Sequence, residues 1–100
     1  MSARIHIDPE MIGEFCRRNQ IRKLSLFGSV LRDDFRPDSD VDFLVEFKPE
    51  ARIGFLGLAR IELELEDLLG REVDSRTPQE LSRYFRDEVV AGAELQYVAD

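Results

Sequence analysis

Two acidic residues and one glycine–serine pair have the types and spacing that could do chemistry in this sequence. Gly28 and Ser29 follow an apolar stretch, and Asp40 and Asp42 stand one residue apart at the start of the next one. Side chains two positions apart on a strand point to the same side, with Cα atoms about 6–7 Å apart. Two carboxylates held this close repel each other. Mg²⁺ removes that penalty, and proteins typically hold it with one or two carboxylates plus substrate phosphates.

The Gly28–Ser29 pair predicts a turn that could bind those phosphates. A glycine lets the backbone approach a phosphate closely, and amides at the start of a helical turn can donate to its oxygens together with the Ser29 hydroxyl. Arg32, one turn further on, could reach the same phosphates. Taken singly, each feature also has a structural explanation, because glycine–serine turns, solvated Asp-x-Asp strand starts and surface arginines are all common.

The elements that must position these residues follow from hydrophobic periodicity and capping residues. Apolar residues alternate through VDFLVEF, which is typical of a strand with one buried face. The stretch 55–69 fits both a strand and a helix, and its length and its leucine and glutamate content favour a helix. Thr77, Pro78 and Glu80 form a capping-box pattern that predicts a third helix.

The whole pattern predicts a mixed β-sheet flanked by helices, in the α/β (α+β) class. The expected helices cover 9–19, 55–69 and 78–90, and the expected strands cover 22–27, 41–47, 72–75 and 94–98. A single helical turn over 30–34 and a polar turn over 36–39 are expected between the first two strands.

Composition narrows the function classes. One hundred residues predict a single domain, 1–100. The net charge of −7 weighs against direct nucleic-acid binding and against a polybasic membrane contact. No stretch has signal-peptide or membrane-span character, so we expect a cytoplasmic protein. Cys16 is the only cysteine and is expected in the core, and with His6 as the only histidine no zinc site is expected.

The stretches LFGSVLRDDFRPDSDVDFLVEF and LLGREVDSRTPQEL together resemble the signature of the DNA polymerase beta-like nucleotidyltransferase superfamily. In that signature a Gly-Ser pair is followed by ten residues and then by Asp-x-Asp. The whole chain resembles the smallest branch, the minimal nucleotidyltransferases (MNT), which are often antitoxins of HEPN-domain toxins. The resemblance implies the nucleotidyltransferase fold and Mg²⁺-dependent transfer of AMP from ATP to a hydroxyl of a partner protein, a tyrosine of a HEPN toxin.

The resemblance also assigns roles to residues. Asp40, Asp42 and Asp74 would be the catalytic carboxylates and would hold two Mg²⁺ ions, with Asp74 also acting as a base on the attacking hydroxyl. Gly28, Ser29 and Arg32 would bind the nucleotide. Two ions in such a site activate the attacking oxygen and stabilise the leaving pyrophosphate.

Two departures from the family pattern stand out. Val30 follows the Gly-Ser pair where many relatives carry a basic residue, and Ser75 stands where relatives often have an apolar one. The alternative hypothesis is a binding module without catalysis, an antitoxin that neutralises its partner by complex formation. Transfer to a small molecule ranks last, because the chain has little room for a second domain. The sequence also leaves open whether the protein forms a homo-oligomer.

Overall fold

The computed structural model describes residues 7–28 and 40–99. In chain order they form α1 (Pro9–Arg18), β1 (Ile21–Phe27), β2 (Val41–Phe47), α2 (Phe55–Leu69), β3 (Val73–Arg76), the 3₁₀ turn η2 (Pro78–Glu80), α3 (Arg86–Gly92) and β4 (Glu94–Val98). Each predicted strand is present within one residue of its expected bounds. The turns expected over 30–34 and 36–39 lie outside the described residues.

Within these residues the strands form one mixed sheet in the order β3-β2-β1-β4. β1 pairs antiparallel with β2 and with β4, whereas β3 runs parallel to β2. Two parallel neighbours need a crossover connection, and α2 provides it between β2 and β3. The predicted mixed sheet flanked by helices is confirmed.

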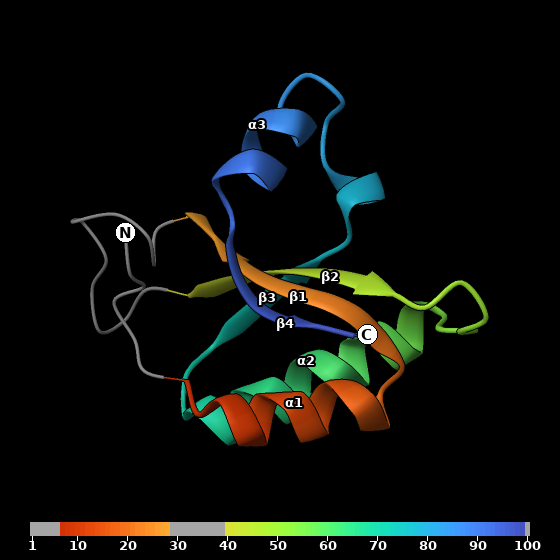
Figure 1. Cartoon of the computed structure of the whole chain (residues 1–100), viewed down its shortest axis with the longest axis vertical. Coiled ribbons are helices and arrows are strands. Elements are labelled where there is room, and N and C mark those ends of the chain that lie inside the picture. Colours follow the sequence, from red (N-terminus) through yellow and green to blue (C-terminus); the bar gives the residue numbers. More distant parts are fainter. Residues whose placement is uncertain (1–6, 29–39, 100) are drawn as a thin grey trace.

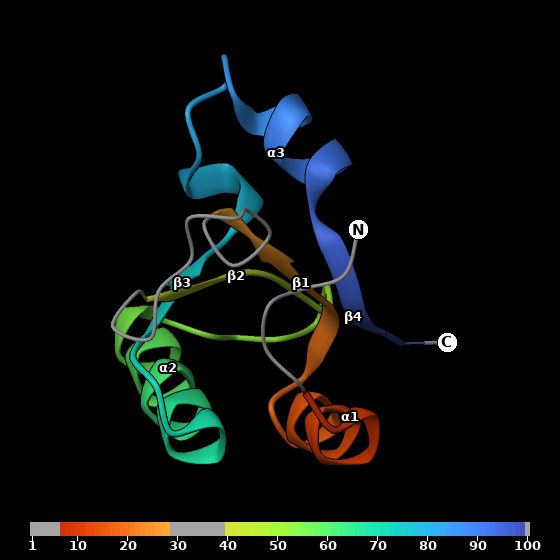
Figure 2. The same cartoon turned by 90° about the vertical axis from the view of Figure 1, so that its left-hand side faces the viewer.

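The core lies between the sheet and the pair α1 and α2, which lie side by side beneath it in both cartoon views (Figures 1 and 2). The alternating residues Val41, Phe43 and Val45 of β2 face these helices and are fully buried. Cys16 on α1 belongs to the same cluster, as expected. Because side chains alternate along a strand, Asp42 must point to the opposite face of the sheet.

Local signals explain where α1 and α2 begin and end. Asp8 caps α1 by accepting a hydrogen bond from the Glu10 N–H at 3.0 Å, and Pro9 occupies the first turn. α2 has the bounds 55–69 that its composition predicted. Gly70 ends it with a left-handed backbone (φ 67°), and its N–H donates to the Glu66 carbonyl at 2.8 Å.

The helix predicted over 78–90 is wrong. Only a 3₁₀ turn, η2, follows Thr77, although Glu80 does accept the Thr77 N–H at 3.0 Å as a capping box requires. The chain then becomes extended at Leu81 (ψ 144°), and the α-helix resumes only at Arg86. Where the helix is interrupted, the guanidinium of Arg86 pairs with carbonyls of the preceding segment.

Arg86 donates to the carbonyls of Pro78 (2.7 Å), Gln79 (3.3 Å) and Leu81 (3.1 Å). One side chain therefore satisfies the groups that the helix would have paired with backbone N–H donors. The stretch from η2 to α3 projects from the sheet on the side away from α1 and α2 (Figure 1). Phe85 is 60% exposed on this projection.

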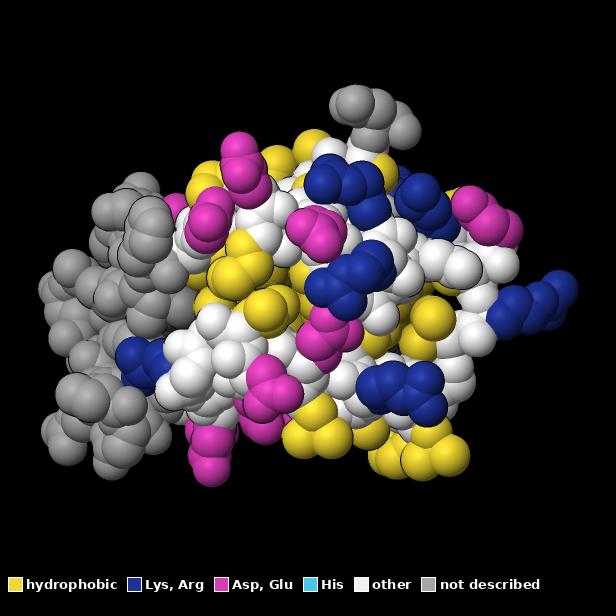
Figure 3. Space-filling model, turned by 90° about the horizontal axis from the view of Figure 1, so that it is seen from below, with side chains coloured by type: hydrophobic (Ala, Val, Ile, Leu, Met, Phe, Trp, Pro, Cys, Tyr) yellow, Lys and Arg dark blue, Asp and Glu magenta, His cyan; other side chains and the backbone are white. Residues whose placement is uncertain are grey.

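The outer face of α1 and α2 carries charges of both signs. Figure 3 shows this face from below, with acidic and basic side chains interspersed around smaller hydrophobic areas. One pair links the helices, with Arg18 donating to Glu64 at 2.6 Å. Among the described residues, no helix combines the length and the apolar character that crossing a bilayer requires.

Candidate active site

The residues singled out in the sequence lie at one end of the sheet, where β1 ends and β2 and β3 begin. This end is on the left in Figure 1. Gly28 directly follows β1, Asp40 directly precedes β2, and Asp42 and Asp74 are the second residues of β2 and β3. Ser29 and Arg32, the other two expected nucleotide-binding residues, lie outside the described residues.

Gly28 lies against the side chain of Asp42. Phe27 is the register partner of Asp42 in the antiparallel β1–β2 pair, so the next residue passes close beside it. A Cβ atom at Gly28 would collide with Asp42 Oδ2 and would lie 3.2 Å from its Cγ. Gly28 also has φ +79°, a backbone conformation that other residues rarely adopt. A glycine is therefore needed here for both space and conformation.

Asp42 and Asp74 are neighbours across the parallel β2–β3 pair. They are register partners, and adjacent strands lie about 4.8 Å apart. Val41 and Val73, which precede them, are partners too and are buried in the core. Both carboxylates therefore point to the face of the sheet that α1 and α2 leave open.

Asp40 has a partner that the sequence did not identify, Glu72. The Val41 N–H donates to the Glu72 carbonyl at 2.9 Å, which brings the two strand starts together. A side-chain hydrogen bond with Asp40, the negative charge of Asp40, burial, and the charge of Glu66 together raise the pKa of the Glu72 carboxyl. Glu72 stands two residues before Asp74, so the same Asp-x-Asp spacing argument could have suggested it.

The acidic side chains at this end of the sheet fit Mg²⁺ in their chemistry but are not yet arranged around a metal ion. Within residues 7–28 and 40–99, no three histidine, cysteine, aspartate or glutamate side chains are already arranged to hold a metal ion. Asp74 is turned toward Arg76, whose guanidinium donates to its Oδ2 at 3.3 Å, and Asp40 is engaged with Glu72. The chemistry nevertheless fits, because carboxylate oxygens are the ligands of a hard cation, and Asp42 and Asp74 are neighbours on adjacent strands.

A hollow of about 210 Å³ opens beside Asp74, between β3 and the start of α2. Phe55, Leu58 and Ala59 make its apolar wall, and Arg76 and Glu80 lie at its polar side. Phe55 is 88% exposed, which is unusual for a large aromatic side chain. The hollow offers a space next to Asp74 for a group with an apolar body and a polar end.

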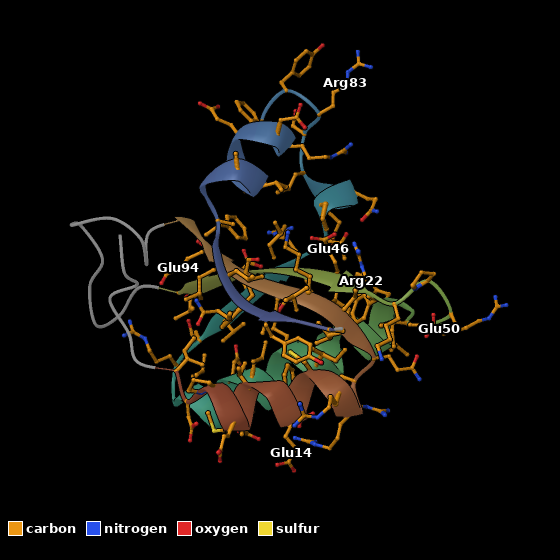
Figure 4. All side chains as sticks on the ribbon, viewed as in Figure 1. Glu14, Arg22, Glu46, Glu50, Arg83 and Glu94 are labelled. Atoms are coloured by element: carbon orange, nitrogen blue, oxygen red, sulfur yellow. The ribbon has the colours of Figure 1, made fainter. Side chains whose placement is uncertain are left out.

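Glu46 lies on the same face of β2 as Asp42 but is not part of this site. Arg22 donates to its Oε1 at 2.9 Å, and Figure 4 shows the two side chains pointing toward one another, away from the end of the sheet that carries Asp42. The open face of the sheet thus has an acidic end, formed by Asp40, Asp42 and Asp74. Further along the strands, the acid Glu46 is paired with Arg22.

The comparison with protein families decides what this arrangement is. Residues 9–95 match the nucleotidyltransferase domain family, a span that includes the end of β1, all three aspartates and the strands that carry them. The chain belongs to the nucleotidyltransferase domain family. The prediction of an enzyme of nucleotidyl transfer is confirmed.

The chain is similar in sequence to proteins named as protein adenylyltransferases. It is 34% identical over 73 residues to a protein of Methanocaldococcus jannaschii named as a candidate protein adenylyltransferase, covering 73% of this chain and 76% of the relative. It is 41% identical over 61 residues to the protein adenylyltransferase MntA of Thermococcus cleftensis, covering 61% of this chain and 60% of that protein.

Solved structures of nucleotidyltransferases share the fold. One described as a candidate minimal nucleotidyltransferase is 35% identical, has a TM-score of 0.67 and is matched over 88% of this chain and 95% of its own. A toxin–antitoxin structure with AMP-PNP has a TM-score of 0.73 at 19% identity, over 94% and 76% of the two chains. A structure of a tri-AMPylated Shewanella oneidensis HEPN toxin in complex with an MNT antitoxin has a TM-score of 0.65 at 19% identity. The match covers 91% of this chain and 70% of that chain. The resemblance to the minimal branch is confirmed.

Proposed function

We propose that this protein transfers AMP from ATP to a hydroxyl group of a HEPN-domain toxin, in the cytoplasm, and acts as the antitoxin of that pair. The observation that carries the proposal is the placement of Asp42 and Asp74 as register partners on the open face of the sheet, with Gly28 against Asp42. A nucleotidyltransferase needs acidic side chains that share divalent cations with the phosphates of the nucleotide.

Asp40, Asp42 and Asp74 would hold two Mg²⁺ ions, which when bound neutralise charge on the phosphates and make the attacking oxygen a better nucleophile. The acceptor oxygen forms a bond to the α-phosphorus of ATP, and the bond from that phosphorus to the pyrophosphate oxygen breaks. The hydroxyl proton passes to a carboxylate oxygen of Asp74, and pyrophosphate leaves. Asp74 suits this role because it lies beside the hollow from which an acceptor could enter.

The nucleotide side of the site would use the turn after β1. The positive φ and missing side chain of Gly28 let the backbone pass close to a phosphate while Asp42 stays in contact. Ser29 and Arg32 would add a hydroxyl and a positive charge to the same phosphates. Their part in the proposal rests on the sequence pattern.

The acceptor side is proposed from the hollow and from the relatives. An apolar wall that ends at a carboxylate fits a side chain with an apolar body and a terminal hydroxyl, such as tyrosine. One relative is named a protein adenylyltransferase, and one structure of the same fold holds an AMPylated HEPN toxin. Both support a protein as the acceptor, and the HEPN toxin as that protein.

Intact mass spectrometry of the partner tests this function. The protein, Mg²⁺ and ATP are incubated with a HEPN-domain toxin as the candidate partner, and the mass of the partner is measured. The Asp40→Ala/Asp42→Ala variant is compared with wild type. The Asp67→Ala/Asp87→Ala variant is the matched control, because it removes the same charge from two exposed positions outside the site.

We expect one or more AMP masses on the partner with wild type and with the control variant, and none with Asp40→Ala/Asp42→Ala. An unmodified partner that forms an equally tight complex with all three proteins would refute the transferase proposal for this partner. That result would instead support neutralisation by complex formation.

A further inference from the structure

Strand β3 lies at the edge of the sheet, and two glutamates of α2 hold its backbone. The Val73 N–H donates to Glu66 Oε2 at 3.1 Å, and the Ser75 N–H donates to Glu62 Oε2 at 2.8 Å. Glu62 and Glu66 are four residues apart, so they lie one above the other on the same face of the helix. The residue between the two bonded amides is Asp74.

We infer that Glu62 and Glu66 are positioning residues that set the location of Asp74. β3 is only four residues long, and its other side is held by parallel pairing with β2. Without the two carboxylates, the Val73 and Ser75 N–H groups would lose their hydrogen-bond acceptors. The backbone of the edge strand would then be held only by its pairing with β2. Hydrogen bonds from backbone N–H groups to carboxylates are about twice as strong as neutral ones.

This inference rests on the proposed function, because the position of Asp74 matters to activity only if Asp74 acts in the transfer. A displacement of about 1 Å in a reacting group can reduce a rate about 100-fold. Glu62 also lines the hollow beside Asp74. The same helix that forms the apolar wall for the acceptor would therefore also fix the acid that receives its proton.

Four variants and one control separate positioning from simple stability. Glu62→Ala and Glu66→Ala remove the acceptors, whereas Glu62→Gln and Glu66→Gln keep an amide oxygen that can accept the same bond. Glu64→Ala is the control on the same helix. It removes a glutamate that pairs with Arg18 and does not touch β3 through any hydrogen bond recorded for the described residues.

The first readout is amide hydrogen exchange of Val73 and Ser75, measured by NMR without metal or nucleotide. We expect each alanine variant to lower the protection of its amide about tenfold or more, while the glutamine variants and Glu64→Ala leave it near wild type. Unchanged protection in the alanine variants would overturn the inference, and it would do so even if the wild-type protein transferred no AMP.

The second readout is the rate of AMP transfer, with the KM for ATP measured separately. We expect roughly a 10- to 100-fold lower kcat in the double variant Glu62→Ala/Glu66→Ala, with a KM for ATP near wild type and rescue by the glutamine pair. If the double variant transfers AMP as fast as Glu64→Ala, the inference is wrong. If wild type transfers no AMP, the proposed function fails, and the exchange data alone decide whether these glutamates position Asp74.

Discussion

Gly28 and Asp42 are in contact across the end of the β1–β2 pair, and the side chain of one occupies the space that a side chain on the other would need. This places the turn proposed to bind phosphates directly beside a carboxylate proposed to hold Mg²⁺. A phosphate and a metal ion that share ligands must be held close together. The contact therefore links the two halves of the proposed site through one glycine.

Replacing Gly28 by alanine should damage both the fold and the site. Gly70 provides the comparison, because it has a similar positive φ of +67° but open space around its Cβ position. Gly70→Ala should cost about 1 kcal/mol of stability from backbone strain alone. Gly28→Ala should cost more, because it adds the collision with Asp42. Urea denaturation of both variants measures the difference.

The affinity for ATP should also differ between Gly28→Ala and Gly70→Ala. We expect Gly28→Ala to weaken ATP binding and Gly70→Ala to leave it unchanged, measured by calorimetry with Mg²⁺ present. Gly92→Ala serves as a further control, since Gly92 has neither a positive φ nor a close neighbour. Equal losses for Gly28→Ala and Gly70→Ala would show that contact with Asp42 is unimportant.

Phe55→Ala should weaken binding of the protein acceptor and leave binding of the nucleotide unchanged. Phe55 lines the hollow beside Asp74, whereas Leu56 is the next residue, is similarly exposed (82% against 88%) and does not line it. We expect the KM for the protein acceptor to rise roughly fivefold or more in Phe55→Ala, with little change in Leu56→Ala. Steady-state kinetics with the partner varied would test this, and a matching effect at Leu56 would count against the hollow.

Ser75→Ala should stabilise the protein. Ser75 is 5% exposed, and its Oγ has no hydrogen-bond partner among the described residues. Removing a buried hydroxyl without a partner should raise the free energy of unfolding by about 1 kcal/mol. Thermal unfolding measures the gain, with the exposed Ser82→Ala as reference. A loss of stability would mean that this hydroxyl has a partner in solution, such as a water molecule.

Cys16 should make the fold sensitive to alkali. Burial raises the pKa of its thiol to about 12, and the charge of Arg17 offsets only part of this effect. The unfolded thiol loses its proton near pH 9 while the folded one keeps it, so stability is complete below pH 9 and falls as the pH rises toward 12. The unfolding free energy of wild type should fall about 1.4 kcal/mol per pH unit more steeply than that of Cys16→Ala. Equal slopes would refute the burial effect.

The sequence was sufficient for the sheet and for the two helices that pack on it. The alternation in β2 and the cap at Asp8 are local signals, and both are confirmed by the register and the hydrogen bonds. The helix over 78–90 was predicted wrongly, because the capping box at Thr77 marks where a helical turn begins and not how far the helix continues. Arg86 takes three carbonyls of the preceding segment, and no periodicity in the sequence reveals that.

The candidate site was only partly accessible from sequence. The spacing of Asp40 and Asp42 predicted a shared face, and the family pattern pointed to Asp74. The spacing of Glu72 and Asp74 could have suggested Glu72 as a further acid, but its pairing with Asp40 depends on the register between strands distant in sequence. The two glutamates of α2 that bond to β3 became visible only with the strands in place.

The parallel pairing of β2 with β3 also has a consequence for how the site comes into being. Asp42 and Asp74 become neighbours only after α2 has crossed over and closed a loop of about thirty residues, a non-local step that is slow compared with local structure formation. A growing chain on the ribosome carries Asp40 and Asp42 long before the third aspartate arrives. The chemistry of this site therefore appears only when the domain is folded as a whole, and it is lost in the same cooperative step.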